Sequence, residues 1–275
     1  MNNYGTLTLN NCNAANGKVN TYYNGYNNSV LYGNAVINNT IFSSTEGTSK
    51  ISGCIFDHKF VCMENSEITG GTFNQIVAVH DYGVITGGYF GGTVASGTVD
   101  DKFIKGGYFK TKPNDNFIAD GYIITASGNS NYPYKVVATH TCDGVTYDKP
   151  LDSSFTGGTL ASGNYYLTEG ITLAKKIEIN ADSNVKICLN GKSINTEDVT
   201  GYGYTINNYG TLTLNNCDTA NGIINTYSFT FLCYNNSVLY GNAAIYSPME
   251  VKGRSKISGC TFNNDISVSY THLRA

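Results

Sequence analysis

The chain has 275 residues, of which 41% are hydrophobic and 13% are charged, and its formal net charge is −3. This composition excludes an intrinsically disordered chain, and the lack of a basic patch excludes nucleic acid as a predicted partner. With 31 glycines, 22 tyrosines, no tryptophan and many Asn, Thr and Ser residues, the composition is typical of an extracellular β-rich protein. No uninterrupted apolar run is long enough to cross a bilayer, so we predict no membrane span.

The N-terminal sequence returns near the C-terminus. Residues 2–12, NNYGTLTLNNC, recur unchanged at 207–217, and NNSVLYGNA (27–35) recurs at 235–243. Recurrence over this distance indicates an array of repeated units. Met1 takes the place of Ile206 in the middle of a unit, so we expect the first unit to lack its beginning.

A shorter period lies within the first copy. The segments KISGCIF, EITGGTF, VITGGYF and FIKGGYF begin at residues 50, 67, 84 and 103. Short apolar–polar alternation indicates strands, and the intervening Gly and Asn residues favour turns. Coils of this length without a helical period predict an all-β fold, a parallel β-helix. Its buried ladder is predicted to contain Ile51, Ile68, Ile85, Ile104, Phe56, Phe73, Phe90 and Phe109.

A leucine-rich repeat is the alternative fold. Leu7, Leu9 and Cys12 resemble the core of that motif. The complete motif does not recur, however, and no helical return segment is visible, so the β-helix is favoured.

The predicted ladder ends at Phe109, and the composition of the chain changes after this residue. Residues 111–137 contain prolines, glycines and short apolar runs, which predict a C-terminal cap for a first unit spanning 1–137. We interpret 138–150 as a polar connector and 151–267 as a second unit that lacks its end. The last residues, 268–275, read VSYTHLRA, which resembles the translation of sequencing-adapter read-through, so we expect a non-native tail there.

The cysteines and histidines give no recognisable ligand motif. There is no CxxC and no Cys/His cluster at ligand spacing, so no metal site and no cofactor are predicted. Cys54 and Cys62 are expected to be buried free thiols, although a bridge between them is the alternative. The neighbours Asp57–His58 and His80–Asp81 are interpreted as surface polar residues.

Tyrosines occupy an outward position beside the predicted phenylalanine column. Tyr89 and Tyr108 each precede a ladder phenylalanine, so their rings should face outward on successive coils. Such rings could bind carbohydrate by stacking on sugar rings, and simple packing between neighbouring strands is the alternative.

Several segments resemble a known kind of protein. The segments GTLASGNYYLTEGITL, ICLNGKSI and GTLTLNNC and the ITGGTF/ITGGYF ladder are similar to repeats of large secreted surface proteins from gut-type anaerobic bacteria. The resemblance covers nearly all of residues 1–267. It implies a pectin-lyase-like, right-handed parallel β-helix in two incomplete tandem units, and a location outside the cell or on the bacterial surface.

The resemblance does not imply an activity, because fold alone does not assign function. Enzymes of that fold use clustered carboxylates with Ca²⁺ and a basic residue, or paired acids. Here Arg254 is the only plausible arginine, and no acidic pair falls one coil apart. We therefore predict no catalytic residues and a non-enzymatic structural or adhesive module, with glycans or host and cell-wall surface components as possible partners. A β-helix that binds or cleaves polysaccharide, with its site outside this chain, is the alternative.

Overall fold

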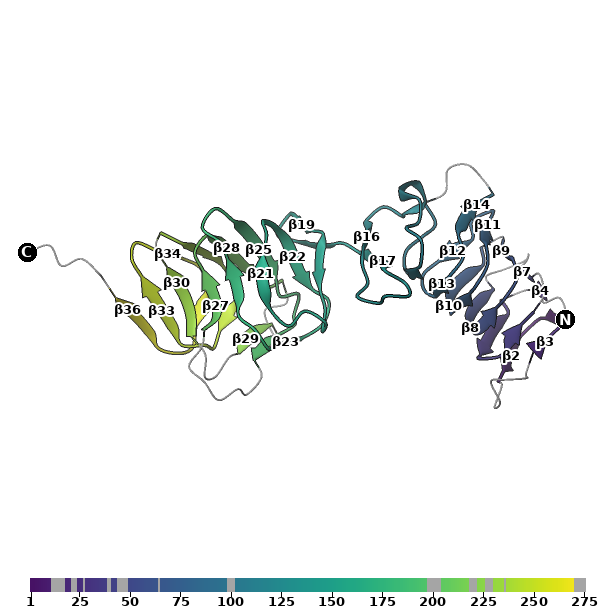
Figure 1. Cartoon of the computed structure of the whole chain (residues 1–275), viewed down its shortest axis with the longest axis horizontal. Coiled ribbons are helices and arrows are strands. Elements are labelled where there is room, and N and C mark those ends of the chain that lie inside the picture. The colour runs from purple at the N-terminus through teal and green to yellow at the C-terminus, as the bar shows by residue number, and fades with distance from the viewer. Residues whose placement is uncertain are drawn as a thin grey trace, which may run out of the picture. The chain divides into compact units, whose positions relative to one another are not determined.

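The computed structural model describes residues 1–10, 18–20, 24–26, 28–38, 41–43, 49–63, 65–97, 102–196, 204–217, 222–225, 230–234 and 236–269. The chain divides into two compact units, unit 1 (1–138) and unit 2 (139–275) (Figure 1). Short parallel strands stack into about 12 coils, which confirms the predicted all-β solenoid. Within the described ranges the only helix is one 3₁₀ turn, η1 (Asp115–Phe117), and no helix there could cross a membrane.

Unit 1 is built on two sheets. The first sheet consists of β1 (Asn2–Asn3), β4 (Asn24–Gly25), β7 (Ile41–Ser43), β9 (Phe60–Cys62), β11 (Val77–Val79) and β14 (Val94–Ser96). The second consists of β2 (Thr6–Leu9), β3 (Lys18–Val19), β5 (Val30–Gly33), β6 (Val36–Ile37), β8 (Lys50–Phe56), β10 (Glu67–Phe73), β12 (Val84–Ile85), β13 (Tyr89–Phe90), β15 (Tyr108–Phe109), β16 (Tyr122–Ala126) and β17 (Tyr134–Ala138). Each coil thereby hydrogen-bonds to the next one.

The isoleucines of the repeated segments form one buried column. Ile68 pairs in parallel register with Ile51 on one side and Ile85 on the other. Ile85 in turn bridges to Ile104. All four side chains are at most 1% exposed. β-Branched residues suit this position because their stiff side chains pack well on a pleated surface.

The phenylalanines form a second buried column. Ring centroids are 4.7 Å apart between Phe56 and Phe73, 5.1 Å between Phe73 and Phe90, and 4.9 Å between Phe90 and Phe109. The planes are within 14° of parallel. Strands in a sheet are about 4.8 Å apart, so identical rings on successive coils stack face to face. Phe60 closes the column from the other sheet, with its ring 5.0 Å from that of Phe73.

Paired glycines separate the two columns. Gly71 has φ +104°, and a Cβ there would lie 2.5 Å from the Gly53 carbonyl oxygen. The β8–β10 register is irregular on both sides of Gly70. The Gly70–Gly71 pair of β10 therefore forms a bulge that suits glycine, and in β8 Cys54 occupies the corresponding place of the repeated segment with φ +66°.

We expect Gly71→Ala to destabilise unit 1 by about 2–3 kcal/mol, because it adds both left-handed strain and a backbone clash. Urea unfolding monitored by tyrosine fluorescence measures the change. Gly5→Ala is the control, since nothing lies within 4 Å of a Cβ at Gly5. An equal loss in both variants would contradict the bulge argument.

A hairpin covers the last parallel coil of unit 1. β16 and β17 pair antiparallel, and β17 also pairs antiparallel with β15, with Phe109 opposite Tyr134. Val136 is 4% exposed and Ile118 9% exposed, so both belong to the core of this unit. The hairpin shields the apolar layer that a solenoid would otherwise expose at its end.

Unit 2 has three parallel sheets. The first is β20 (Lys149–Leu151), β22 (Gly163–Leu167), β25 (Asn184–Cys188), β28 (Thr211–Asn215), β31 (Val238–Gly241) and β34 (Lys256–Ile257). The second is β21 (Gly158–Leu160), β24 (Ile177–Ile179), β27 (Tyr204–Asn208), β30 (Thr230–Tyr234), β33 (Met249–Lys252) and β36 (Ile266–Ser269). The third is β23 (Ile171–Leu173), β26 (Ile194–Thr196), β29 (Ile223–Asn225), β32 (Ala244–Ile245) and β35 (Thr261–Phe262).

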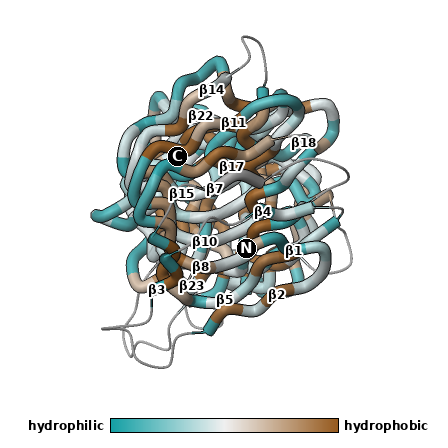
Figure 2. Tube along the Cα trace, turned by 90° about the vertical axis from the view of Figure 1, so that its right-hand side faces the viewer, coloured by the Kyte–Doolittle hydropathy of each residue, from teal (hydrophilic) through white to brown (hydrophobic). Residues whose placement is uncertain are grey.

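The ends of unit 2 differ from a plain solenoid. The segment interpreted from sequence as a polar connector forms a separate hairpin, β18 (His140–Cys142) with β19 (Val145–Tyr147), and then β20. Val268 and Ser269, the start of the expected tail, end β36 and pair with β33. Residues 270–275 of that expected tail lie outside the described residues. Along the coils hydrophobic stretches alternate with hydrophilic ones (Figure 2).

The repeated sequences make the same internal contacts in both units. Asn3 donates from Nδ2 to the Val30 carbonyl oxygen at 3.1 Å and accepts from the Gly5 N–H at 3.1 Å. Asn208, its counterpart, makes the two equivalent bonds at 2.9 and 3.1 Å. Both asparagines are nearly buried, so the bonds satisfy side chains that would otherwise be costly inside the coil.

Candidate functional site

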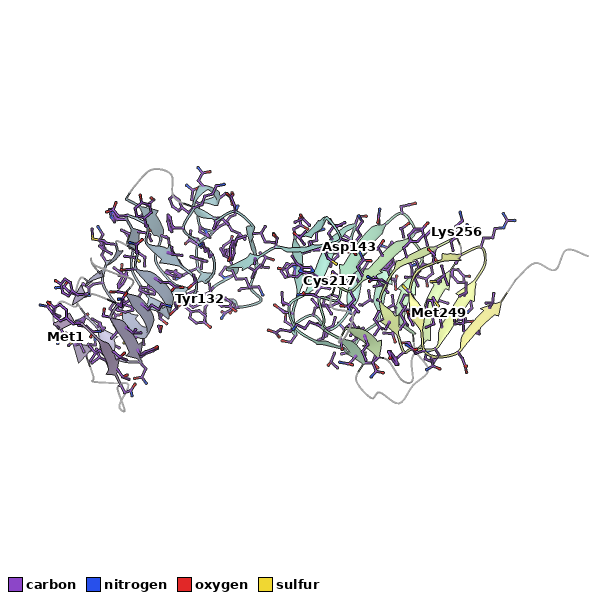
Figure 3. The ribbon with its side chains drawn as sticks, turned by 180° about the vertical axis from the view of Figure 1, so that it is seen from behind. Met1, Tyr132, Asp143, Cys217, Met249 and Lys256 are labelled. Atoms are coloured by element: carbon purple, nitrogen blue, oxygen red, sulfur yellow. The ribbon has the colours of Figure 1, made fainter. Side chains whose placement is uncertain are left out.

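The outward tyrosines lie on the last two coils of unit 1. Tyr89 and Tyr108 are register partners, and their rings stack with centroids 5.0 Å apart and planes 16° apart. Tyr89 is 41% exposed, whereas Tyr108 is half-buried beside β17. Tyr132, in the loop between β16 and β17 (Figure 3), places its ring 5.2 Å from that of Tyr89 at 59°. These three residues are called the tyrosine face below.

A cavity of about 560 Å³ adjoins the tyrosine face at Tyr132, the one member of the face that lines it. Asn74, Gly91 and Lys110, from three successive coils, line one side, and the loop 130–133 lines the other. Asn74 donates from Nδ2 to Asp57 Oδ1 at 2.6 Å. The site combines aromatic rings with an amide and an ammonium group, which are groups that contact the faces and hydroxyls of sugars.

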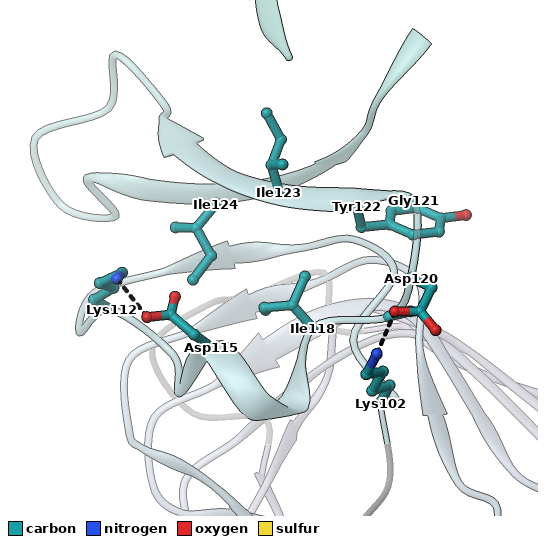
Figure 4. A pocket seen from close by; sticks show the side chains of 10 residues that line it. Lys102, Lys112, Asp115, Ile118, Asp120, Gly121, Tyr122, Ile123 and Ile124 are labelled. Atoms are coloured by element: carbon teal, nitrogen blue, oxygen red, sulfur yellow. Dashed lines mark hydrogen bonds and ion pairs between the residues drawn. The ribbon is translucent and has the colours of Figure 1, made fainter. Parts of the chain in front are cut away.

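A second cavity, of about 440 Å³, lies between the 3₁₀ turn and the cap hairpin (Figure 4). Its lining includes the apolar side chains Ile118 and Ile124. The charges at its edge are paired, Lys112 with Asp115 at 3.0 Å and Lys102 with Asp120. Exposed pairs of this kind contribute little stability. The four charged side chains that line this cavity all belong to these two pairs, so each of them already has a partner.

The acid–imidazole neighbours lie at the surface. His58 and Asp81 are exposed, while Asp57 and His80 are half-buried. Asp57 is occupied by its bond from Asn74. Arg254 is exposed as well.

Most of the described cysteines are buried thiols. Cys54 and Cys62 are free and buried, and burial raises their pKa values to about 11 and about 12. Burial likewise raises the pKa of Cys233 and of Cys260 to about 11. Thiolate is scarce at such pKa values, so these four side chains are chemically quiet.

Four residues that are far apart in the sequence meet in unit 2. The ligand atoms of His140, Cys142, Cys188 and Cys217 all lie within 4.8 Å of one another. We call them the Cys₃His cluster. No metal site was predicted from the sequence, and these four residues were not recognised there as a group. Cys217 and the hairpin residue Asp143 are labelled in Figure 3.

The hairpin and two coils position the cluster. Asp143 and Gly144 have φ of 49° and 72°, the positive values of a tight Asp-Gly turn. His140 and Cys142 alternate along β18 and therefore share one face. Cys188 is the last residue of β25, and Cys217 follows β28 on the next coil.

The contacts within the cluster are short. His140 Nε2 is 3.2 Å from Cys188 Sγ and 3.3 Å from Cys217 Sγ. The two sulfur atoms are 3.7 Å apart. Tyr166 stacks on the imidazole at 5.6 Å and 23°, and the fully buried Tyr147 lies 5.8 Å away. Aromatic rings thus shield one side of the cluster from water.

Burial controls the protonation of these groups. It raises the pKa of the Cys142 and Cys188 thiols, and the neighbouring thiols raise that of Cys142 further. Burial lowers the pKa of His140, which favours the neutral imidazole. Three thiols and a neutral imidazole can bind a soft cation, and Cys188 with Cys217 could alternatively form a disulfide.

The signal for this cluster in the sequence is weak. His-Thr-Cys followed by Asp-Gly indicates a tight hairpin carrying two ligands. The other two ligands come from later coils, so their spacing reflects coil length and not a ligand motif. Cys12, the repeat counterpart of Cys217, lies outside the described residues. Comparison of the chain with known protein families, curated proteins and solved structures gives no match.

Proposed function

We propose that the chain is a non-enzymatic structural or adhesive module of a large, repetitive bacterial protein that is secreted or held at the cell surface. The supporting observation is that repeated sequence occupies repeated structure. Leu31 and Leu239 are both fully buried, while Tyr32 and Tyr240 are 43% and 45% exposed. The two copies therefore keep the same buried residue and the same exposed residue at this place. Such repetition is typical of a module whose copies add length or avidity.

The use of charge supports the same proposal. Glu67, Glu178 and Glu250 each pair with a lysine, at 3.3, 2.8 and 3.0 Å. In the described part of the chain, the only group of three or more His, Cys, Asp or Glu ligands is the Cys₃His cluster, which contains no carboxylate. A β-helical lyase would instead gather its carboxylates around calcium.

The contacts between the edges of neighbouring coils are of a kind that tolerates extracellular conditions. Amides stack between coils, with Asn24 donating to Asn2 and Asn38 donating to Asn20, both at 3.2 Å. Such contacts are neutral and do not weaken with salt, unlike surface ion pairs. The raised pKa values of the buried thiols also slow their oxidation.

Glycan binding at the tyrosine face is the second candidate function. The stacked rings, the tilted Tyr132 and the adjoining cavity with Lys110 favour a saccharide, and the ammonium group favours an acidic one. Binding of a glycan at the tyrosine face is compatible with an adhesive module, whereas cleavage of a glycan would contradict the non-enzymatic proposal.

A polysaccharide challenge tests the proposal. The 275-residue chain is incubated with pectin, polygalacturonate and mucin glycans, and new reducing ends and unsaturated uronates are measured. We expect no products in any mixture, with or without added Ca²⁺. Products that increase with protein concentration would overturn the non-enzymatic proposal in favour of a lyase or hydrolase.

Removal of the tyrosine face tests the second candidate. For any acidic glycan that binds, we expect Tyr89→Ala with Tyr108→Ala to weaken binding about ten-fold, as calorimetry would measure. Tyr4→Ala is the matched control, since Tyr4 stacks on Tyr26 at 5.0 Å in the same way on another coil. Equal loss in the control, or no glycan bound at millimolar concentration, would exclude the tyrosine face as a glycan site.

A further inference from the structure

We propose that the Cys₃His cluster binds one structural Zn²⁺ ion, which fastens the β18–β19 hairpin to the coils of unit 2 that contain β25 and β28. The proposed site consists of His140, Cys142, Cys188 and Cys217. The proposed zinc site is independent of the proposed surface role, because it concerns the attachment of the β18–β19 hairpin within unit 2.

Three of the ligand-atom separations are close to those of tetrahedral zinc. With Zn–S near 2.3 Å and Zn–N near 2.05 Å, a tetrahedron places two sulfurs about 3.8 Å apart and a sulfur and a nitrogen about 3.6 Å apart. The observed distances are 3.7 Å between Cys188 and Cys217 and 3.2 to 3.3 Å from His140 Nε2. These three separations are within about 0.4 Å of the tetrahedral values, and the separations that involve Cys142 Sγ are at most 4.8 Å.

The donor set selects the metal and its role. Three sulfurs and one imidazole nitrogen are soft or borderline ligands, which favour zinc over calcium and magnesium. Four protein ligands close the coordination shell and leave no open position for a substrate. Such a closed shell is typical of a structural site. Each thiol releases its proton to solvent when it becomes a ligand, so binding should weaken as the pH falls.

An ion here would add to a small set of contacts between the hairpin and the coils, in which Tyr147 and Cys142 pack against Tyr166 and Cys188. β18 and β19 pair only with each other, and they join none of the three sheets of unit 2. An isolated two-stranded hairpin is marginally stable in water. Its described attachments include Asn164 Nδ2 to the Thr146 carbonyl oxygen at 2.9 Å and Asn215 Nδ2 to Tyr147 Oη at 3.2 Å. A metal bound by two hairpin residues and two coil residues would cross-link them directly.

A disulfide between Cys188 and Cys217 is the competing use of the cluster. It would employ two sulfurs and give no role to His140 or to Cys142, which is 3% exposed. Zinc uses all four groups at once. The two uses make opposite predictions under reducing conditions, where a disulfide is lost and a zinc site persists.

Cobalt substitution tests the site directly. The full chain is stripped of metal, kept reduced and titrated with Co²⁺, then with Zn²⁺. We expect one Co²⁺ per chain with the intense visible bands of tetrahedral thiolate coordination, and their loss when Zn²⁺ is added. Cys142→Ser and Cys188→Ser should each remove these bands, whereas Cys54→Ser and Cys260→Ser, which change thiols outside the cluster, should retain them.

A second variant and a second measurement guard against misfolding. His140→Cys supplies a fourth sulfur and should keep tetrahedral binding with a shifted spectrum. Hydrogen exchange of residues 140–147 should be slowed by Zn²⁺ in the unchanged chain and accelerated by a chelator. Absence of stoichiometric metal in the reduced unchanged chain, or full binding by Cys188→Ser, would overturn the proposal. A reductant-sensitive Cys188–Cys217 disulfide without metal binding would assign the cluster to redox chemistry instead.

Discussion

Replacing Ile68 by aspartate is expected to destabilise unit 1 by about 3–5 kcal/mol, because it buries a carboxylate without a partner. Ile68 is fully buried between Ile51 and Ile85, so the new side chain would face apolar groups on both neighbouring coils. Urea unfolding of the full chain, followed by far-UV circular dichroism, measures the loss. Where the loss exceeds the stability of unit 1, that unit should unfold while unit 2 remains folded.

The loss should also depend on pH with a defined sign. Burial raises the folded-state pKa of the introduced carboxyl above its unfolded value of about 3.9. The penalty is therefore full above the raised pKa and shrinks as the pH falls toward the unfolded value. Thr72→Asp is the control, because Thr72 lies on the same strand at a half-buried position of the outward column. A comparable and pH-independent loss in Thr72→Asp would contradict the buried column.

Phe73→Ala is expected to cost about 3–5 kcal/mol through lost burial and the cavity left behind. Its ring is in contact with three others, stacking on Phe56 and Phe90 and meeting the edge of Phe60. The two rings stacked on Phe73 belong to strands one coil away on each side, and those strands prevent the space from closing. Denaturant unfolding of the full chain measures the change.

A conservative variant separates volume from aromatic stacking. Phe73→Leu keeps most of the buried volume, so we expect a loss of less than about half that of Phe73→Ala. Ile76→Ala serves as the outer control, because Ile76 is 45% exposed and its truncation should change stability by less than about 1 kcal/mol. If Phe73→Ala were as mild as Ile76→Ala, the stacked column would not be a principal source of stability.

The solenoid was predictable because its signal is repeated. Ile51, Ile68, Ile85 and Ile104 occur at nearly regular intervals, and each occurrence strengthens the same interpretation. The paired glycines were visible as well, although their positive φ could be known only from the backbone. Local patterns of this kind act within one coil and between adjacent coils, so the sequence displays them directly.

The start of unit 2 was not predictable in the same way. Residues 138–150 contain few apolar residues and match a linker by composition, yet they form a hairpin and the first strand of a sheet. The tyrosine face was expected at Tyr89 and Tyr108, but Tyr132 and the adjoining cavity depend on how the cap loop folds back. Cap loops follow no coil period.

The sequence by itself determined the repetition, the strand period and which side chains enter the core, because these follow from spacing along one chain. Only the tertiary structure brought His140 and Cys142 together with Cys188 and Cys217. The hairpin folds back over the coils, and stacking brings the ends of β25 and β28 one strand apart. Residues that come together because coils stack have no fixed spacing in the sequence, since the lengths of the loops vary between coils. Their proximity is therefore visible only in the three-dimensional structure.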